Sequence, residues 1–207
     1  MRFRFALIGL ALAWGVMLLF GAMEFDRGLL MFFYAGDHPA LATFARWATE
    51  LGGLKVVVPA TAAGAAFLLY RRDWRGAVLL VAITLSGRLL VSLQKDWTGR
   101  IRPDPHGHLV QVESLSFPSG HSANATLVWL CLALLLPFPP RVKPFAVWTA
   151  VWIALCVGAS RVMLGVHWPS DVIGGWAFGL FWTLLLLPLS GHEADQGTPP
   201  GARHSAR

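Results

Sequence analysis

The stretch RVMLGVHWPSDVIGGW, residues 161–176, places an arginine, a histidine and an aspartate between two strongly apolar runs. Pro169 suits the first turn of a helix, so the second apolar run begins close to this proline. Asp171 then lies at the start of that helix, four residues after His167. The stretch predicts two consecutive apolar helices joined by a short polar turn.

The composition of the whole chain agrees with this interpretation. Of its 207 residues, 56% are hydrophobic and 14% are charged, whereas a soluble domain has about 25% charged residues. The mean hydropathy is +0.57. A membrane-spanning helix needs roughly 20 apolar residues, and the candidate runs lie at about 5–23, 54–70, 76–94, 121–137, 145–163 and 170–189. We predict an all-α fold, a polytopic membrane helical bundle with six transmembrane helices in a single domain over residues 1–190.

The charged residues predict which way the bundle faces. With the N-terminus in the cytoplasm, the inner segments carry nine basic residues: Arg2, Arg4, Arg71, Arg72, Arg75, Arg141, Lys143, Arg203 and Arg207. The inner segments hold three of the 11 acidic residues, and the other eight fall in outer segments. Basic residues mark the cytoplasmic side, so we expect both termini there, in a multi-pass protein of the inner (cytoplasmic) membrane. The net charge of +6 is then a topology signal and predicts no nucleic-acid partner.

Three segments outside the later spans have their own predictions. The first apolar run follows the basic start MRFRF, but FGAME after it has no clear A-x-A cleavage site, so we expect a retained helix. Residues 24–53 form the longest outer connection, with a short helix that starts near Pro39 and whose Leu41, Phe44, Ala48 and Leu51 share one face. That helix either lies along the membrane interface or packs on the bundle. Residues 191–207 predict a disordered cytoplasmic tail.

Three polar clusters fall on the outer side by helix parity alone. They are KDWTGRIRP at 95–103, FPSGHS at 117–122 and SRVMLGVHWPSD at 160–171. Arginine and lysine bind phosphate oxygens, which makes Lys95, Arg102 and Arg161 candidate phosphate anchors. Gly120 and Ser119 open the fourth span, where free backbone amides and the helix dipole attract an anion. The clusters together predict a phosphate-binding site.

The two histidines of these clusters predict the chemistry. A neutral imidazole is a nucleophile toward phosphorus, and a carboxylate on its other ring nitrogen fixes the tautomer. We therefore expect His167 to be the nucleophile and Asp171 its partner. His121 has no comparable local carboxylate, and it is a candidate general acid for the leaving oxygen.

The motifs K-x6-R-P (Lys95 to Arg102-Pro103), P-S-G-H (118–121) and S-R-x5-H-x3-D (160–171) resemble the signature of the type-2 phosphatidic acid phosphatase family. That family is part of the acid phosphatase and vanadium haloperoxidase superfamily. The resemblance implies a metal-independent membrane lipid phosphatase with a phosphohistidine intermediate and no cofactor. It implies the same roles for His167, Asp171 and His121, and phosphate binding by Lys95, Arg102, Ser119, Gly120 and Arg161.

The expected partners are membrane lipids and a lipid phosphate substrate: prenyl (undecaprenyl) diphosphate, phosphatidic acid or phosphatidylglycerol phosphate. Two alternatives stay open, a lipid phosphotransferase that uses the same phosphohistidine and a transporter of anionic lipids.

Four side chains outside the signature have weaker signals. Arg100 is expected to be solvated or to face lipid headgroups. His106 and His108 are expected to belong to a plain loop without metal. Arg88 lies on the same helix face as Lys95 but deeper, and it is functional, paired with a carbonyl or extended outward to the membrane surface.

Overall fold

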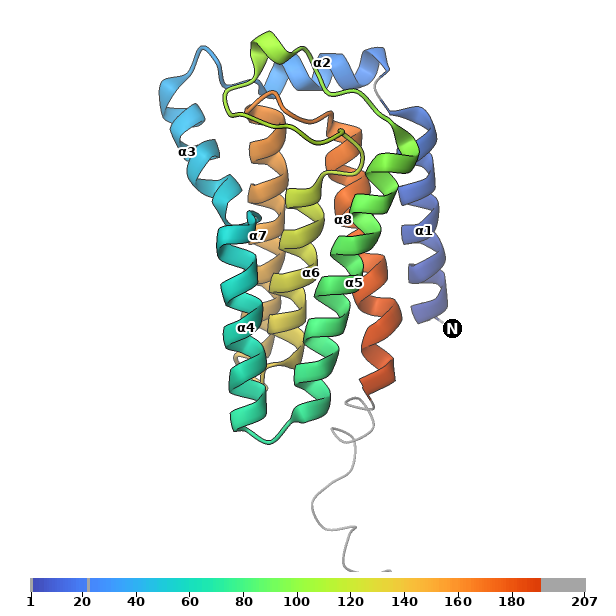
Figure 1. Cartoon of the computed structure of the whole chain (residues 1–207), viewed down its shortest axis with the longest axis vertical. Helices are drawn as coiled ribbons and strands as arrows, with labels where there is room; N and C mark the ends of the chain where they lie inside the picture. The colour runs from blue at the N-terminus through green and yellow to red at the C-terminus, as the bar shows by residue number, and fades with distance from the viewer. Residues whose placement is uncertain (1, 22, 191–207) are drawn as a thin grey trace, which may run out of the picture.

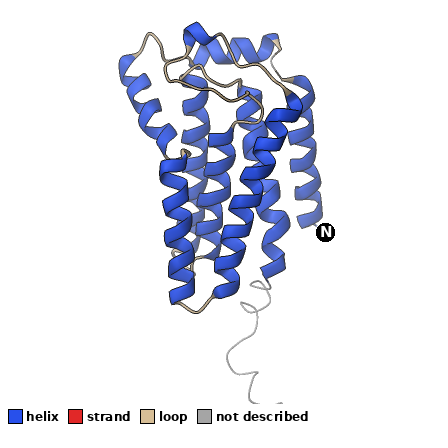
Figure 2. Ribbon diagram, in the orientation of Figure 1, coloured by secondary structure: helices blue, strands red, loops and turns tan. Residues whose placement is uncertain are grey.

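The computed structural model describes residues 2–21 and 23–190, which contain helices and loops and no strand (Figure 2). The predicted tail at 191–207 lies outside the described residues. The α-helices are α1 (Arg2–Phe20), α2 (Glu24–Phe33), α3 (Pro39–Glu50), α4 (Leu54–Tyr70), α5 (Trp74–Thr98), α6 (Gly120–Leu135), α7 (Lys143–Met163) and α8 (Pro169–Leu186), with 3-10 turns at Pro105–Gly107 and Leu187–Ser190. The all-α prediction is confirmed for the described residues.

Each of the six predicted apolar runs is a helix, and local signals explain where the helices begin and end. The Asp73 carboxylate accepts a hydrogen bond from the backbone N–H of Gly76 at 2.9 Å, which caps the start of α5. Gly99 ends α5 in the left-handed region with φ of 59°. Pro169 is the first residue of α8, as its fixed φ predicts.

The number of membrane spans is less definite than the number of helices. By length and apolar composition, four described segments can cross a membrane: Pro39–Tyr70, Trp74–Thr98, Lys143–Met163 and Pro169–Leu186. A fifth is possible if the bent pair Phe3–Leu19 and Glu24–Phe33 counts as one span, whereas Gly120–Leu135 is a shorter apolar helix. The count of six spans therefore remains a prediction.

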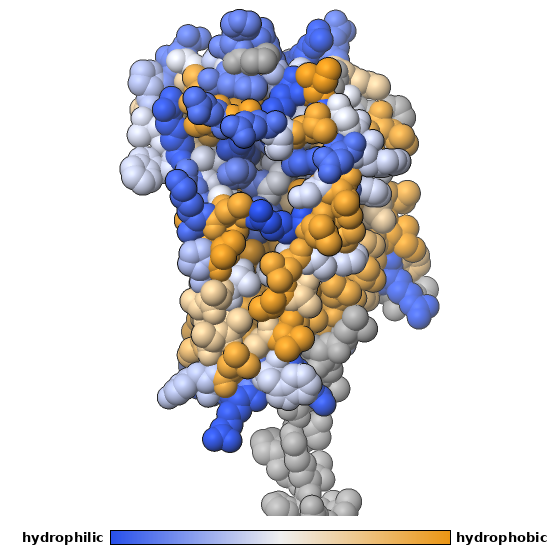
Figure 3. All heavy atoms as spheres, in the orientation of Figure 1, coloured by the Kyte–Doolittle hydropathy of each residue, from blue (hydrophilic) through white to orange (hydrophobic). Residues whose placement is uncertain are grey.

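Helix α6 lies at the centre of the bundle. It contacts α4, α5, α7 and α8, while α1 packs against α8 at the edge (Figure 1). One large buried cluster joins α4, α5 and α6, and its members are Leu68, Ala77, Leu80, Ile83, Leu127, Cys131 and Leu135. The outward sides of the helices are apolar too, since Leu85, Leu89 and Leu93 of α5 are exposed. Figure 3 shows hydrophobic residues over the middle and lower bundle and hydrophilic residues gathered at the upper end.

Small residues bring α8 close to α6. A Cβ atom on Gly175 would lie 2.7 Å from the Ser119 carbonyl oxygen, and one on Gly179 would lie 2.9 Å from Cβ of Thr126. Close approach of this kind is typical of packed membrane helices. It places the start of α8, with Asp171, directly beside the start of α6.

The outer connection at 24–53 contains two helices, and only the second of them was predicted. Helix α2 lies across the upper end of the bundle (Figure 1). Its signals were acidic residues in the first turn, Glu24 and Asp26. Helix α3 starts at Pro39 as predicted, and it packs on α7.

The face that Leu41, Phe44, Ala48 and Leu51 were predicted to share is only partly turned toward the bundle. Ala48 is buried together with Ala45 and Thr49, whereas Leu41 and Phe44 are exposed. Small side chains allow α3 to approach α7 closely, so packing selected them over the larger apolar residues.

Candidate active site

His167 and Asp171 form the pair that the sequence predicted. His167 lies in the turn between α7 and α8 and is 1% exposed. Its Nδ1 atom is 3.3 Å from Oδ2 of Asp171. The same carboxylate oxygen accepts the backbone N–H of Trp168 at 2.9 Å. The link therefore crosses the first turn of α8, which fixes the carboxylate relative to the imidazole.

The other ring nitrogen of His167 faces a cation. Nη1 of Arg102 lies 3.0 Å from Nε2 of His167. A guanidinium only donates hydrogen bonds, so Nε2 accepts and the ring proton is on Nδ1, where it is donated to Asp171. Burial, together with the positive charges of Arg102 and Arg161, holds the pKa of His167 well below its usual value of 6.5. The imidazole is therefore neutral at pH 7, with an unprotonated nitrogen on the side of the cations.

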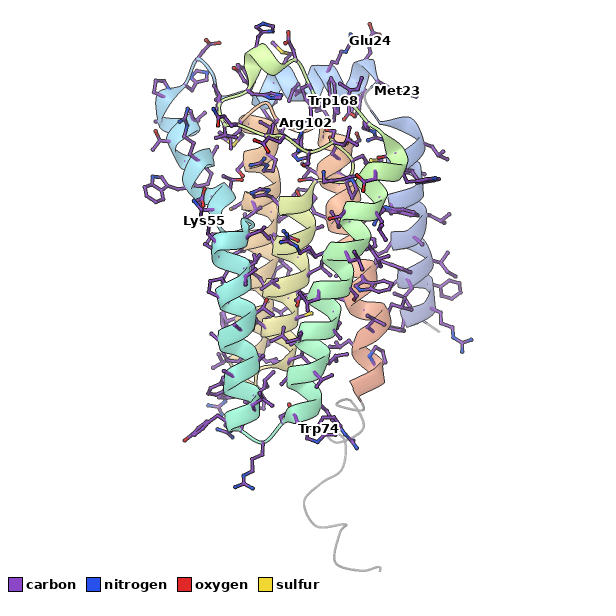
Figure 4. All side chains as sticks on the ribbon, viewed as in Figure 1. Met23, Glu24, Lys55, Trp74, Arg102 and Trp168 are labelled. Carbon is purple, nitrogen blue, oxygen red and sulfur yellow. The ribbon has the colours of Figure 1, made fainter. Side chains whose placement is uncertain are left out.

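The predicted phosphate anchors converge on this imidazole. The charges of Lys95, Arg102, Arg161 and His121 all lower the pKa of His167. Figure 4 shows Arg102 and Trp168 at the end of the bundle that α2 covers, whereas Trp74 marks the opposite end. Side chains from 95–102, from α6 and from the α7–α8 turn thus meet in one place, as helix parity predicted.

Lys95 and Arg102 are held by backbone carbonyl groups of the loop that precedes α6. Nζ of Lys95 donates to the carbonyl oxygen of Leu115 at 2.5 Å, and Nε of Arg102 donates to that of Ser114 at 2.6 Å. Nη1 of Arg102 also donates to the Val166 carbonyl oxygen at 2.5 Å. Burial lowers the pKa of Arg102 to about 10, so it stays charged at pH 7. Carbonyl oxygens can be exchanged for phosphate oxygens without loss of hydrogen bonds.

Arg161 is buried, and one of its hydrogen-bond donors has no partner among the described residues. Its Nη1 donates to the Thr49 hydroxyl at 2.7 Å. Its Nε is a buried atom without a hydrogen-bond partner among the described residues. Because an unpaired buried donor is costly, this N–H is poised for an oxygen atom from a ligand. Thr49 was missed by sequence reasoning, and no local pattern within 24–53 indicated it.

The P-S-G-H segment builds the start of α6 as predicted. Ser119 is fully buried and is the N-cap residue. Its hydroxyl accepts from the Ser122 hydroxyl at 2.9 Å. Gly120 is the first helical residue, and a Cβ there would lie 3.9 Å from the Lys95 side chain. The N–H groups of this helix start therefore lie beside Lys95, an arrangement that suits an anion.

His121 has a different environment from His167. It is half-buried, and its ring has no hydrogen-bond partner among residues 2–21 and 23–190. A Cβ on Gly53 would lie 3.7 Å from its Nε2 atom, so the α3–α4 junction borders it. A ring without a fixed partner is free to exchange a proton with a substrate.

The prediction of a solvated Arg100 is wrong. Its Nη1 atom is 2.9 Å from Oδ1 of Asp171, its side chain is 11% exposed, and its guanidinium lies 4.3 Å from the centroid of the Phe117 ring. Ser116 was also missed, and its hydroxyl donates to Oδ2 of Asp171 at 2.5 Å. The sequence did contain a pattern that could have indicated the role of Arg100. Side chains two apart in an extended segment point the same way, and Arg100 is two residues before Arg102.

The remaining weaker signals lie away from this pair. His106 is exposed and its Nδ1 lies 2.9 Å from the Asp104 carboxylate, while the His108 ring donates to the Pro103 carbonyl oxygen at 3.1 Å. Within the described ranges, no three His, Cys, Asp or Glu side chains gather into a group that could hold a metal ion. Arg88 is half-buried on α5.

Comparison with known proteins places this geometry in a family. The family model of the PAP2 superfamily matches residues 75–193. Phosphatidylglycerophosphatase B of Bacillus subtilis is 40% identical over 137 residues, which are 64% of this chain and 66% of that protein. Lipid A 1-phosphatase of Rhizobium johnstonii is 40% identical over 97 residues, 42% of this chain and 36% of that protein.

The similarity extends to the three-dimensional structure. The crystal structure of a transmembrane PAP2-type phosphatidylglycerolphosphate phosphatase from Bacillus subtilis superposes with a TM-score of 0.83 at 31% identity. The superposition covers 91% of this chain and 97% of that one. With all three signature motifs assembled around His167, this chain belongs to the PAP2 superfamily.

Proposed function

We propose that the protein is an integral membrane phosphatase that removes phosphate from a lipid phosphomonoester or diphosphate. One observation carries the proposal: the His167 imidazole has Nδ1 on Asp171 and an unprotonated Nε2 directed at Arg102. A buried, neutral and oriented imidazole next to several cations is suited to attack a bound phosphate. The relatives named above as phosphatases support the same chemistry.

The proposed reaction has two steps at one phosphorus atom. Arg102 gives up its hydrogen bond to Nε2 and, with Lys95 and Arg161, binds the phosphate oxygens. Nε2 of His167 forms a bond to phosphorus while the bond to the lipid oxygen breaks, and His121 donates a proton to that oxygen. The imidazolium of the phosphohistidine is stabilised by Asp171.

The second step returns the enzyme to its starting state. The oxygen of water forms a bond to phosphorus while the bond between phosphorus and Nε2 of His167 breaks, His121 accepts a proton from that water, and inorganic phosphate leaves. The cations and the N–H groups at the start of α6 offset the negative charge in both steps. We propose that no metal ion takes part, and we expect full activity in EDTA and inhibition by orthovanadate, a mimic of five-coordinate phosphorus. Loss of activity in EDTA that a divalent ion restores would contradict this.

The substrate class follows from the position of the site. The anchors lie at the ends of apolar helices, so a lipid reaches them by lateral diffusion while its tails stay in the membrane. The advantage over a soluble ester is mainly positioning and local concentration. Phosphatidylglycerol phosphate is the first candidate substrate, because both Bacillus subtilis matches described above are named as phosphatases of this lipid. Prenyl diphosphate is the second, because a compact chain offers little polar surface to recognise a large headgroup.

A panel assay tests this function. Phosphate release by the purified protein is measured in mixed micelles at equal surface concentrations of phosphatidylglycerol phosphate, phosphatidic acid, prenyl diphosphate and, as the soluble control, nitrophenyl phosphate. We expect kcat/KM for at least one lipid to exceed that for the soluble ester by about tenfold or more. Equal rates on all four would contradict lateral access, and release from none would contradict the proposed function.

We further propose six spans with both termini in the cytoplasm, so that the site faces the outside of the inner membrane. The support is the basic residues Arg71, Arg72, Arg75 and Arg141, which are exposed at the end opposite the site. The test uses His106→Cys and Val142→Cys, one at a time, in a Cys156→Ser background. An impermeant maleimide is expected to label the first on whole cells and the second only after lysis. Equal labelling of both on whole cells would contradict the topology.

A further inference from the structure

Asp171 is a fully buried carboxylate with a full set of hydrogen bonds. Its Oδ2 atom accepts from Ser116, from the Trp168 backbone and from His167, and its Oδ1 atom accepts from Arg100. A buried charge is costly unless it is paired. Among the described residues, Arg100 is the one arginine or lysine within ion-pair distance of Asp171. The charge on Asp171 therefore depends on Arg100.

The other half of the Arg100 guanidinium is bound to α1. Nη2 donates to the carbonyl oxygens of Met17 at 2.8 Å and Leu18 at 2.7 Å. These carbonyls belong to the last turn of α1, where backbone acceptors lack helical partners and the helix dipole is negative. Nη1 also donates to the Ser170 hydroxyl at 3.3 Å. The planar fork of an arginine serves both sides at once, which the single ammonium of a lysine does not.

We propose that Arg100 is a positioning residue that keeps the Asp171 carboxylate charged and aimed at Nδ1 of His167, and that the last turn of α1 completes the active site by holding Arg100. The inference rests on the proposed function, because Arg100 acts through the nucleophile pair. The inference extends the site beyond the signature motifs to the first helix. Met17, one of the two residues of α1 that bind Arg100, precedes it by 83 residues.

Gly21 provides the space in which Arg100 lies. A Cβ atom at Gly21 would be 2.1 Å from Nη1 and 2.4 Å from Cζ of Arg100. Only the far end of a flexible side chain is in the way, so an alanine here displaces the guanidinium without removing its charge. Gly15, within α1, has nothing within 4 Å of a Cβ atom and supplies the control.

The pH dependence of the reaction separates positioning from simple support of the fold. Activity requires a charged Asp171 and a neutral His167. Charged or titratable groups from several elements act on this pair: Lys95 from α5, Arg100 and Arg102 from the loop after α5, His121 from α6 and Arg161 from α7. Asp26 of α2 also lies close, because it is hydrogen-bonded to Ser170, the residue before Asp171. Removal of the Arg100 charge makes protonation of the pair easier. The acid limb of the pH profile then moves to higher pH, whereas a loss of folded protein lowers the whole profile without moving it.

The test compares Arg100→Gln, Arg100→Lys and Gly21→Ala with Gly15→Ala and with Arg46→Gln, which removes an exposed charge from α3. Arg100→Gln is expected to lower kcat about tenfold to a hundredfold, with KM within about twofold, and to move the acid limb to higher pH. Arg100→Lys restores the position of the limb and part of kcat. Gly21→Ala is expected to change kcat and the acid limb of the pH profile in the same direction as Arg100→Gln. The two controls, Gly15→Ala and Arg46→Gln, are expected to match the unaltered protein.

Three results would overturn the inference: unchanged kcat and pH limb in Arg100→Gln, no rescue of the limb by Arg100→Lys, or Gly21→Ala identical to Gly15→Ala. If the unaltered protein releases phosphate from no lipid of the panel, the proposed function fails, and the inference is then decided by nitrogen-15 NMR of histidine-labelled protein in micelles. The protonation midpoint of His167 is expected to rise in Arg100→Gln and to return in Arg100→Lys. An identical midpoint in all three proteins would overturn the inference independently of activity.

Discussion

The two ends of the helix bundle differ in whether their charged side chains are buried or exposed. At the end that α2 covers, Arg161 and Asp171 are buried, and they bond to residues distant in the chain, such as Thr49 and Arg100. At the other end, Arg71, Arg72, Arg75 and Arg141 are exposed, and Asp73 accepts a hydrogen bond from Gly76, three residues away.

The contrast separates two uses of charge. Local caps and exposed arginines cost little. The caps define where helices stop, and the arginines support the proposed orientation of that end toward the cytoplasm. Buried ions cost several kcal/mol each unless they are paired, so they are expected only where they serve function. Variants at the two ends are therefore predicted to have different effects, on catalysis at one end and on stability at the other.

The largest effect is predicted for His167→Ala. Without the proposed nucleophile, kcat is expected to fall by about 10⁴-fold or more, because a nucleophile, the residue that orients it and the phosphate-binding residues act as a unit. Phosphate release in micelles measures this effect. His106→Ala removes an exposed ring from the same end and is expected to be neutral. An active His167→Ala protein, free of contaminating phosphatase, would remove the basis of the mechanism.

The second-largest effect on catalysis is predicted for Asp171→Asn. An amide cannot fix the Nδ1–H tautomer, and the corresponding loss in a serine protease triad is about 10⁴-fold, so we expect a fall in kcat of about 10³- to 10⁴-fold with little change in KM. Asp37→Asn, at an exposed position of the same end, is the control for loss of charge. If Asp171→Asn affected KM alone, Asp171 would be a substrate contact.

Thr49→Val tests whether α3 belongs to the site. The substitution keeps the shape but removes the hydroxyl that accepts from Arg161 at 2.7 Å. Loss of a hydrogen bond to a charged group costs about 1.5–3 kcal/mol, so kcat/KM is expected to fall by roughly tenfold or more, mainly through KM. The control is Thr43→Val on the same helix, whose exposed hydroxyl donates to the carbonyl oxygen of Pro39. Equal kinetics in the two variants would limit α3 to a structural role.

Leu80→Ala is predicted to have the smallest effect on catalysis. Leu80 is fully buried in the cluster between α4, α5 and α6. Its truncation is expected to cost about 2–5 kcal/mol of stability, measured as a lower thermal unfolding temperature in detergent, with kcat of the folded protein unchanged. Leu85→Ala, exposed on the same helix, is expected to change neither quantity. A large fall in kcat for Leu80→Ala would show that the two ends are coupled.

The same contrast explains which features were predictable from the sequence. The six apolar helices and the motifs of the candidate site follow from local patterns: apolar length, Pro169 at a helix start, and a histidine four residues before an aspartate. Helix parity was enough to bring Lys95, His121 and His167 to one end.

The missed residues share a physical reason. Arg100, Ser116 and Thr49 reach their partners across 71, 55 and 112 residues of chain, respectively. Such contacts depend on how helices pack, which a hydropathy pattern does not specify. For the same reason the apolar pattern of α3 did not indicate that Ala45 and Thr49 are buried.

The central claim is that phosphate passes through His167 before it reaches water. The most direct measurement is the stereochemical course of hydrolysis of a lipid phosphorothioate that is made chiral at phosphorus with oxygen isotopes. Two successive in-line displacements, first by His167 and then by water, each invert phosphorus, so the account predicts overall retention of configuration. Overall inversion would show a single direct attack by water and would contradict a phosphohistidine intermediate.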